Sequence, residues 1–417
     1  MPRVRPEVRP LYSLYSANAI SYAGNVLTAL AIPWFVLSST GSASKTGQVA
    51  AFGMIPVIIA GVFGGTLVDR FGFKRCSIAA DLASGTTVAA IALCHALGVL
   101  SFPLLLILVF AGALLDAPGQ TSRSALVPNL AAMAGETIDR ASATLQAVER
   151  GSRLVAAPIA GLLIALTGAV GLLWIDAVTF AISAFLVLVF VPRQAKPAAL
   201  EVSGGYWVDM RAGFAFIRGQ AIVIAIVATV MLTNGIDAAK GSVTMPVLAK
   251  DVFHSSFALG LMFAASGGGA VLGAILYARY GSRRSRRNIF IGGFVIASIP
   301  MIIFAFLPPL WLVLLLQVIG GIAAGPLNPI IYAIWFDRVP EAMRGRVFGT
   351  ISSAALLAVP LGVLIGGLLV DWIGLPWTFA ITGGIQLLVV LSLLINPAIR
   401  EMDSYGTPGP IAPHPVA

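Results

Sequence analysis

Asp116 and Asp237 are the acidic residues of this sequence best suited to carry a proton. Each lies in a long apolar run, in GALLDAPGQ and TNGIDAAK, where an ionised side chain costs roughly 2.5–3.5 kcal/mol at the middle of a bilayer. Burial destabilises the charged form of a carboxylic acid, so such a residue can exchange a proton near neutral pH. Lys240 lies one helical turn from Asp237 and favours its ionised form, whereas Asp116 has no basic neighbour within a turn. Asp116 is therefore the first candidate for a proton carrier.

Polar residues recur at helical spacing on four of the apolar runs. Those of the first half are Ser21, Asn25 and Thr28, then Asp116, Gln120 and Arg123; those of the second half are Thr233, Asn234, Asp237 and Lys240, then Asn328, Tyr332 and Trp335. Steps of three and four place each set on one helical face. We predict that these faces line a substrate cavity, with Trp34 adding to its aromatic lining. Hydrogen bonding between helices without transport is the alternative for each set.

The composition indicates a chain that lies in a membrane. Hydrophobic residues make up 58% of the sequence and charged residues 10%, against roughly 25% charged residues in a typical soluble domain. Apolar runs reach the ~20 residues that cross a bilayer as a helix. We count twelve of them, at 12–37, 48–68, 76–97, 102–121, 145–166, 170–191, 221–247, 257–278, 288–306, 310–334, 347–370 and 376–397. The sequence therefore predicts an all-α membrane protein with twelve transmembrane helices.

The basic residues predict the orientation of these helices. Short loops rich in Lys and Arg stay in the cytoplasm, and a cytoplasmic N-terminus places most of the 26 Lys and Arg residues on that side. Both termini are then cytoplasmic. The net charge of +9 reflects this topology, so we expect membrane lipids and no nucleic acid as partners. Residues 1–10 are polar with no cleavage site after them, so the first helix is expected to be retained.

The sequence repeats itself at half its length. GGTLVDRFGFKR at residues 64–75 returns as GAILYARYGSRRSRR at residues 273–287, each after the second apolar run of its half. We predict two pseudo-symmetric six-helix bundles, 1–191 and 221–397. A cytoplasmic linker at 192–220, with an interfacial helix, joins them, and a disordered cytoplasmic tail follows at 398–417.

The first copy of this repeat resembles the loop signature of the major facilitator superfamily. The matching residues are Gly65, Leu67, Asp69, Arg70, Gly72, Lys74 and Arg75. The resemblance implies the major facilitator fold, with the first and fourth helices of each half around a central cavity. It also implies a cytoplasmic gate, in which Asp69 holds the start of the eleventh helix near Arg346, with Arg123 joining the cluster. A carboxylate near a helix N-terminus is favoured by the helix dipole.

Two further stretches resemble one branch of that superfamily. RSALVPNL at Arg123 and RGRVFG at Arg344 are similar to the drug, macrolide and siderophore exporters, and within these to Tap-type multidrug efflux pumps. The resemblance implies a monomeric antiporter of the bacterial inner membrane that exports amphipathic or cationic drugs against protons. Many relatives carry an acid where this sequence has Asn25, so the coupling would fall to Asp116 or Asp237. Asp176 is interpreted as structural.

Other functions remain as alternatives. A dedicated exporter of one native metabolite, such as a siderophore, fits the same pattern. A membrane enzyme or sensor would need a clustered catalytic set, and the sequence shows none, so we expect no enzyme. Three scattered histidines and two cysteines give no metal-ligand spacing, and we expect neither a metal nor a cofactor.

Overall fold

The computed structural model describes residues 7–193, 206–281, 285–340 and 343–403, without the side chains of 60–71, 206–210, 212, 345 and 403. Throughout these residues the regular structure is helical. The longer elements are α1 (Arg9–Thr40), α2 (Ala43–Phe71), α3 (Phe73–Ala96), α4 (Phe102–Ala134), α5 (Ile138–Phe190), α6 (Tyr206–Arg218), α7 (Ala221–Ala239), α9 (Ser256–Tyr280), α10 (Arg286–Phe304), α11 (Leu310–Ala324), α12 (Leu327–Arg338) and α13 (Arg344–Ile395). Short segments, η1 (Lys240–Thr244), α8 (Met245–Val247) and η2 (Leu248–Val252), extend α7, and α14 (Pro397–Arg400) and η5 (Glu401–Asp403) end the described chain.

The number of predicted spans agrees with these helices. Within the described residues, nine helical segments are long and apolar enough to cross a bilayer. Two of them, α5 and α13, each hold two spans that meet at a glycine, and α2 supplies one more. The twelve predicted spans are therefore present, and the all-α membrane fold is confirmed.

The two glycines mark equivalent reversals of the chain. Gly168 in α5 has φ 74° and ψ 168°, and Gly374 in α13 has φ 82° and ψ 165°. Residues with a side chain avoid this region of backbone space, whereas glycine enters it readily. The fifth and sixth spans are therefore joined directly at Gly168, without a loop between them. The eleventh and twelfth spans are joined in the same way at Gly374. The shared geometry fits the predicted repeat of one half in the other.

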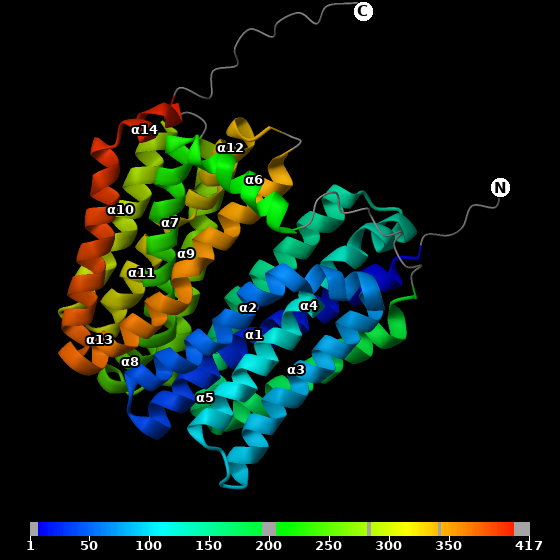
Figure 1. The fold of residues 1–417 in the computed structure, drawn as a ribbon. Helices are drawn as coiled ribbons and strands as arrows, with labels where there is room; N and C mark the ends of the chain where they lie inside the picture. The colour runs from blue at the N-terminus through cyan, green and yellow to red at the C-terminus, as the bar shows by residue number, and fades with distance from the viewer. Residues whose placement is uncertain (1–6, 194–205, 282–284, 341–342, 404–417) are drawn as a thin grey trace, which may run out of the picture.

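The helices form two bundles that touch at one end and diverge at the other (Figure 1). Helices α1 to α5 make one bundle and α7 to α13 the other, and both ends of the described chain, the start of α1 and η5 after α14, lie at the diverging end. We call the end where the bundles diverge the open face. The opposite end, where the bundles meet, is the closed face.

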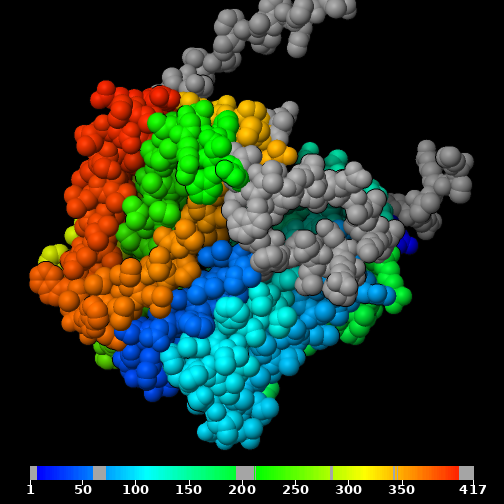
Figure 2. All heavy atoms as spheres, in the orientation of Figure 1, coloured from blue at the N-terminus to red at the C-terminus, as the bar shows by residue number. Residues whose placement is uncertain are grey.

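Two contacts join the bundles near the closed face. At the first residues of α2, Asp371 of α13 accepts hydrogen bonds from the Ser42 hydroxyl and from the backbone N–H groups of Ala43 and Ser44, each at 2.9 Å. Figure 2 shows α2, in blue, directly beside the orange part of α13. The second contact joins α5 and α9, where the Ser256 hydroxyl donates to the Gly161 carbonyl at 3.0 Å. We call the first contact the Asp371 cap.

Glycines let the two bundles approach closely along these contacts. A Cβ atom on Gly367 of α13 would lie 2.6 Å from the Ala43 carbonyl oxygen, and one on Gly161 would lie 2.7 Å from the Ser256 carbonyl oxygen. Such distances are too short for a real carbon atom, so larger residues would push the helices apart. Close packing through small residues is a main source of helix association in membranes.

The helix ends differ from the predicted spans at two places. The apolar run of the fourth span ends at 121, but α4 continues to Ala134, because Arg123 is buried inside the first bundle and does not end the helix. The tail expected from residue 398 starts with two short helices, and Ile399 and Met402 pack into the core of the second bundle. Residues 404–417 lie outside the described chain. The proposed bundle and linker boundaries stay predictions.

Candidate functional site

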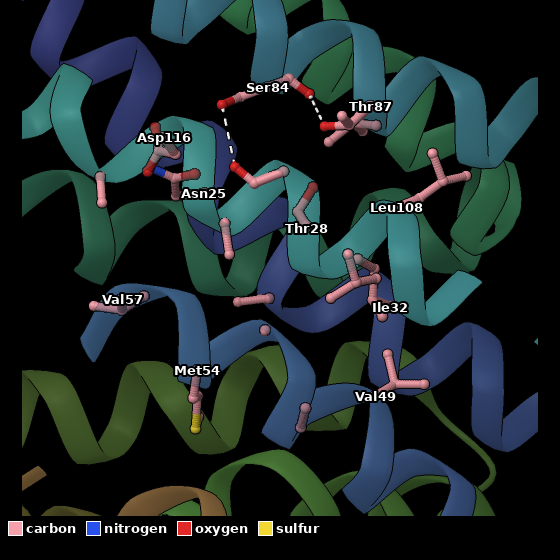
Figure 3. Close-up of a pocket in the computed structure, with 18 of the residues that line it drawn as sticks. Asn25, Thr28, Ile32, Val49, Met54, Val57, Ser84, Thr87, Leu108 and Asp116 are labelled. Carbon is pink, nitrogen blue, oxygen red and sulfur yellow. Dashed lines mark hydrogen bonds between the residues drawn. The ribbon is translucent and has the colours of Figure 1, made fainter. Parts of the chain in front are cut away.

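A cavity of about 450 Å³ lies within the first bundle and reaches the second at Ser242. Its polar lining residues are Asn25, Thr28, Ser84, Thr87, Asp116, Gln120, Thr121 and Ser242, and its apolar ones include Ile32, Val49, Met54, Val57, Val88, Ile91, Leu108, Val109 and Phe180. Figure 3 shows the side chains of α1, α2, α3 and α4 that surround this space. The volume falls within the ~300–1,000 Å³ of pockets that hold drug-sized ligands.

Asp116 lies in the wall of this cavity with only neutral hydrogen-bond donors. Its Oδ2 accepts from Asn25 Nδ2 at 3.2 Å and from Gln120 Nε2 at 2.6 Å. Its Oδ1 is buried and has no hydrogen-bond partner among the described atoms. Asn25, Thr28, Asp116 and Gln120, which the sequence assigned to two separate helices, therefore meet at one site. The unbonded oxygen is free to bind a proton or a ligand donor.

The charge of the cavity is limited to that single acid. Among the described lining residues, Asp116 is the one with an ionisable side chain, and no Lys or Arg is among them. Most of the remaining wall is aliphatic, and Met54 adds a flexible, polarisable side chain of the kind that adapts to varied ligands. The cavity is therefore suited to amphipathic molecules that are neutral or positively charged.

Asp176, which the sequence analysis read as structural, touches this cavity through Thr28. The Thr28 hydroxyl donates to Asp176 Oδ2, and the Thr179 hydroxyl donates to Asp176 Oδ1 at 2.9 Å. Asp176 is fully buried. Gly24 makes room for the acid, because a Cβ atom there would lie 2.2 Å from Asp176 Oδ1. The hydroxyl oxygen of Thr28 thus lies between the cavity and the buried side chain of Asp176.

Arg123 lies in a buried cluster within the first bundle. Its Nη1 pairs with Asp81 Oδ1 at 2.7 Å, its Nε donates to Asn18 Oδ1 at 3.0 Å, and its Nη2 donates to Ser21 Oγ at 3.1 Å. Ser183 Oγ donates to the other oxygen of Asp81 at 2.7 Å. Both charged side chains are fully buried. The sequence placed Ser21 in the cavity lining and Arg123 at the gate, and in this structure both belong to the Asp81–Arg123 cluster.

The predicted cavity residues of the second bundle lie outside this cavity. Thr233 donates to the Thr229 carbonyl of its own helix, and Asn234 donates to the Ala355 carbonyl of α13 at 3.0 Å. Asp237 is exposed and Lys240 is half-buried, and no salt bridge joins them in the described structure. The spacing predicted that these two charges act on each other, and they do so in the described structure without forming a salt bridge.

The predicted aromatic lining is also placed elsewhere. Trp34 packs against the core of the closed face, and Trp335 is buried in the core of the second bundle. Asn328 and Tyr332 are exposed on α12, and the Tyr332 ring meets Trp335 edge-on at 5.3 Å. Their role in substrate binding stays a prediction.

The predicted gate falls largely outside the described side chains. Gly65, Asp69 and Arg70 lie in the 60–71 stretch of α2, of which only the backbone is described. Gly72 follows with φ 83°, a backbone conformation that favours glycine. Arg346 lies in the first turn of α13, at the open face, and is exposed. The gate remains a prediction.

The sequence did contain a signal for the residues that were missed. Ser77, Asp81, Ser84 and Thr87 recur on α3 at steps of three and four, the same spacing that identified the other polar faces. Ser84 and Thr87 line the cavity, and Figure 3 shows Ser84 bonded to the Gly112 carbonyl and Thr87 bonded to the Ser84 carbonyl. The cavity wall thus includes the third helix of the first half as well as the first and fourth.

Comparison with known proteins gives matches along nearly the whole chain. The family model of the Major Facilitator Superfamily matches twice, at residues 14–239 and 228–413. The multidrug efflux pump Tap of Mycolicibacterium fortuitum is 31% identical over 403 residues, 96% of this chain and 98% of that protein. Macrolide efflux protein A of Streptococcus pyogenes is 21% identical over 398 residues, 94% of this chain and 97% of that protein.

Solved structures share the fold at low sequence identity. The crystal structure of the nucleoside transporter NupG aligns with a TM-score of 0.77 and 14% identity, covering 95% of this chain and 99% of that one. The crystal structure of a D-xylose-proton symporter aligns with a TM-score of 0.69 and 16% identity, covering 91% of this chain and 96% of that one.

Proposed function

Because this chain belongs to the major facilitator superfamily, we propose that it is a drug exporter of the bacterial plasma membrane, moving amphipathic or cationic small molecules out of the cell in exchange for protons. The observation that carries the proposal is Asp116, an acid in the cavity wall that has neutral donors on one oxygen and no partner on the other. The efflux named for its relatives supports the direction of transport.

The mechanism follows from the two ends of the molecule. With both termini in the cytoplasm, the open face is the cytoplasmic one, so a drug enters the cavity from inside the cell. The bundles then rock about the central site, which closes the open face and opens the closed face. Release of the drug and protonation of Asp116 occur on the outer side, and the return step brings the proton inward.

Asp116 couples these movements because its charge changes what the cavity stabilises. An ionised carboxylate in an apolar wall is stabilised by a cationic or hydrogen-bond-donating ligand. A protonated one is neutral and no longer needs such a ligand. The cavity therefore holds either a ligand or a proton at this group, which is the requirement for exchange of one against the other.

Transport in liposomes tests the proposal. Purified protein is reconstituted into vesicles with an acidic lumen and a neutral exterior, and uptake of ethidium, erythromycin and tetracycline is measured. We expect uptake of at least one of them that collapses when nigericin removes the pH gradient. Uptake that ignores the gradient would reject proton antiport. Movement of the siderophore desferrioxamine without any of the drugs would favour the dedicated metabolite exporter.

A further inference from the structure

Three acids inside the first bundle, from three different helices, contact one face of α1. Ser21 Oγ donates to Asp81 Oδ1 of α3 at 3.4 Å, and Asn25 Nδ2 donates to Asp116 Oδ2 of α4 at 3.2 Å. The Thr28 hydroxyl donates to Asp176 Oδ2 in the second span of α5. The three donors are spaced by four and three residues, so the acids succeed one another over roughly 10 Å of the helix axis, at 1.5 Å per residue.

Among the described residues, only one of these acids forms a salt bridge. Arg123 forms a salt bridge with Asp81 at 2.7 Å. The hydrogen-bond partners described for Asp116 are Asn25 and Gln120, and those for Asp176 are Thr28 and Thr179, all of them neutral. An unpaired charge inside a membrane is expensive, so a neutral, protonated form is accessible to both. Asp116 and Asp176 therefore share one environment, with neutral hydrogen-bond donors and no salt bridge among the described residues, whereas Asp81 is held by the charge of Arg123.

Other charged groups on the packed helices do not change this assignment. On α1 and α3, the helices packed against this span of α5, Arg9, Lys74 and Arg75 lie in the end turns at the open face, and Asp81 is paired. On α4 the charged groups are Asp116 and Arg123, and on the first span of α5 Glu149 pairs with Arg153 at 2.8 Å while Asp139, Arg140 and Arg150 accompany them. The hydrogen bonds described for the Asp176 carboxylate come from none of these groups.

Thr28 connects the two unpaired acids. Its side chain lines the cavity together with Asp116, and it donates its hydroxyl proton to Asp176. A hydroxyl group both donates and accepts hydrogen bonds, so it can pass a proton on, which the amide of Asn25 does not do readily. Since α1 runs from the open face at Arg9 to the closed face at Thr40, Thr28 and its acid lie closer to the closed face than Asn25 and Asp116.

We propose that Asp176 is a second proton-carrying residue, which exchanges a proton with Asp116 through the Thr28 hydroxyl and water in the cavity. This inference rests on the proposed proton antiport. In the step, protonated Asp176 gives its proton to Thr28 Oγ1, Thr28 gives its own hydroxyl proton to a water molecule, and that water gives a proton to Asp116. Asp176 ends ionised and Asp116 neutral, with Thr28 and the water unchanged. The proton thus enters from the side of the closed face.

Four substitutions test this relay. Asp176→Asn keeps one acceptor oxygen, its NH2 group can donate to the hydroxyl that faced the other oxygen, and it cannot titrate. Thr28→Val removes the hydroxyl at nearly constant shape, and Thr28→Ser restores it. Thr179→Val is the matched control, because it removes the other hydroxyl donor of Asp176, which does not line the cavity. Each variant is compared with the unaltered protein, using the drug probe that the latter moves fastest.

Two assays on the same vesicles separate a proton role from a structural one. Uptake driven by a pH gradient requires net proton movement, whereas counterflow of labelled against unlabelled drug without a gradient does not. We expect Asp176→Asn and Thr28→Val to lose gradient-driven uptake to the level of empty vesicles and to keep counterflow. Thr28→Ser and Thr179→Val should keep both.

Gradient-driven uptake that survives in Asp176→Asn or in Thr28→Val would overturn the relay. So would equal loss of uptake and counterflow in Thr28→Val, which would make the contact structural; this second variant decides the matter if Asp176→Asn does not fold. Failure of the proposed function would look different, because the unaltered protein itself would then show no gradient-driven uptake.

Discussion

The two bundles share one fold but hold charge in opposite ways. In the first bundle, Asp81, Asp116 and Asp176 all contact α1, and Arg123 balances one of them. In the second, no salt bridge joins Asp237 and Lys240 in the described structure, and the contact of α9 with α11 depends on glycines: a Cβ atom on Gly273 would lie 2.1 Å from the Ile322 carbonyl oxygen. Under the proposed proton exchange, the candidate proton carriers with described hydrogen bonds lie in the first half, while close glycine packing joins helices of the second.

The largest effect is expected from breaking the buried ion pair of the first bundle. Asp81→Asn leaves the fully buried Arg123 without its counter-charge, which costs roughly 3–5 kcal/mol. We expect the variant to unfold at a clearly lower temperature in detergent, or to fail to insert. The double variant Asp81→Asn with Arg123→Met removes the stranded charge and should recover much of the loss. A single variant that melts like the unaltered protein would show that the pair does not support the bundle.

Asp116→Asn should abolish function without harming the fold. The amide resembles a protonated carboxyl group in shape and hydrogen bonding, so drug binding should survive, while uptake driven by a pH gradient falls to background. Glu149→Gln is the control, because that acid pairs with Arg153 on a partly exposed surface and should transport normally. Full gradient-driven transport by Asp116→Asn would show that another acid carries the proton, with Asp176 and Asp237 as the next to be tested.

A smaller effect is expected at the closed face from Asp371→Asn. The neutral side chain loses the charge that favours the N-terminal dipole of α2, and about 1.4 kcal/mol would shift the balance between the two facings tenfold. A cysteine at Val49, in a background without Cys76 and Cys94, should react faster with an impermeant maleimide added from the closed face. Asp251→Asn, an exposed acid bonded to its neighbour Lys250, should leave that rate unchanged. Equal reaction rates in Asp371→Asn and Asp251→Asn would show that the Asp371 cap does not hold the closed face shut.

Asp69→Asn tests the other end of the same helix. We predict that Asp69 holds the eleventh span when the open face closes, so its loss should favour the state described here. At up to ~1 kcal/mol for an exposed acid at a helix terminus, the shift is roughly fivefold or less. A cysteine at Thr121, exposed in the cavity wall, should become more reactive from the open face. An unchanged rate would leave Asp69 with a role in topology alone.

The smallest effect is expected from Asp237→Asn. The sequence alone would predict a misfolded protein, because the change would strand Lys240. Since no salt bridge joins the two side chains in the described structure, we expect a smaller loss of stability than for Asp81→Asn, because the change breaks no ion pair. The melting temperature in detergent measures it, with Asp81→Asn as the contrasting variant. A fall in melting temperature as large as that of Asp81→Asn would show that Asp237 and Lys240 stabilise the fold as a charge pair.

The sequence predicted what depends on composition and periodicity. Twelve apolar runs, a half-length repeat and the polar faces of α1 and α4 are local patterns, and the bundle and the meeting of Asn25, Gln120 and Asp116 follow from them. The partners of single acids could not be obtained in this way. Asp176 meets Thr28 148 residues away, and Asp371 meets Ser42 329 residues away, so each contact depends on how whole helices pack.

A spacing can also mislead when it is interpreted as a contact. Lys240 follows Asp237 at a step of three, the spacing of neighbours on a regular helix, but no salt bridge joins the two side chains in the described structure. Arg123 shows the reverse case, since a basic residue that ends an apolar run in sequence is buried by a partner on another helix.

The chain reverses at Gly168 without a loop between the fifth and sixth spans, and this has a consequence for proteolysis. Connections at the closed face are short, and the basic residues near it in the described chain are Lys45 and Lys250, both within helical segments. At the open face, Arg193 is exposed just after α5. Trypsin added to sealed vesicles from the closed face should therefore leave the chain whole. Added from the open face, it should cut near Arg193 into two fragments of similar size, and the cell surface from which this happens identifies the cytoplasmic side.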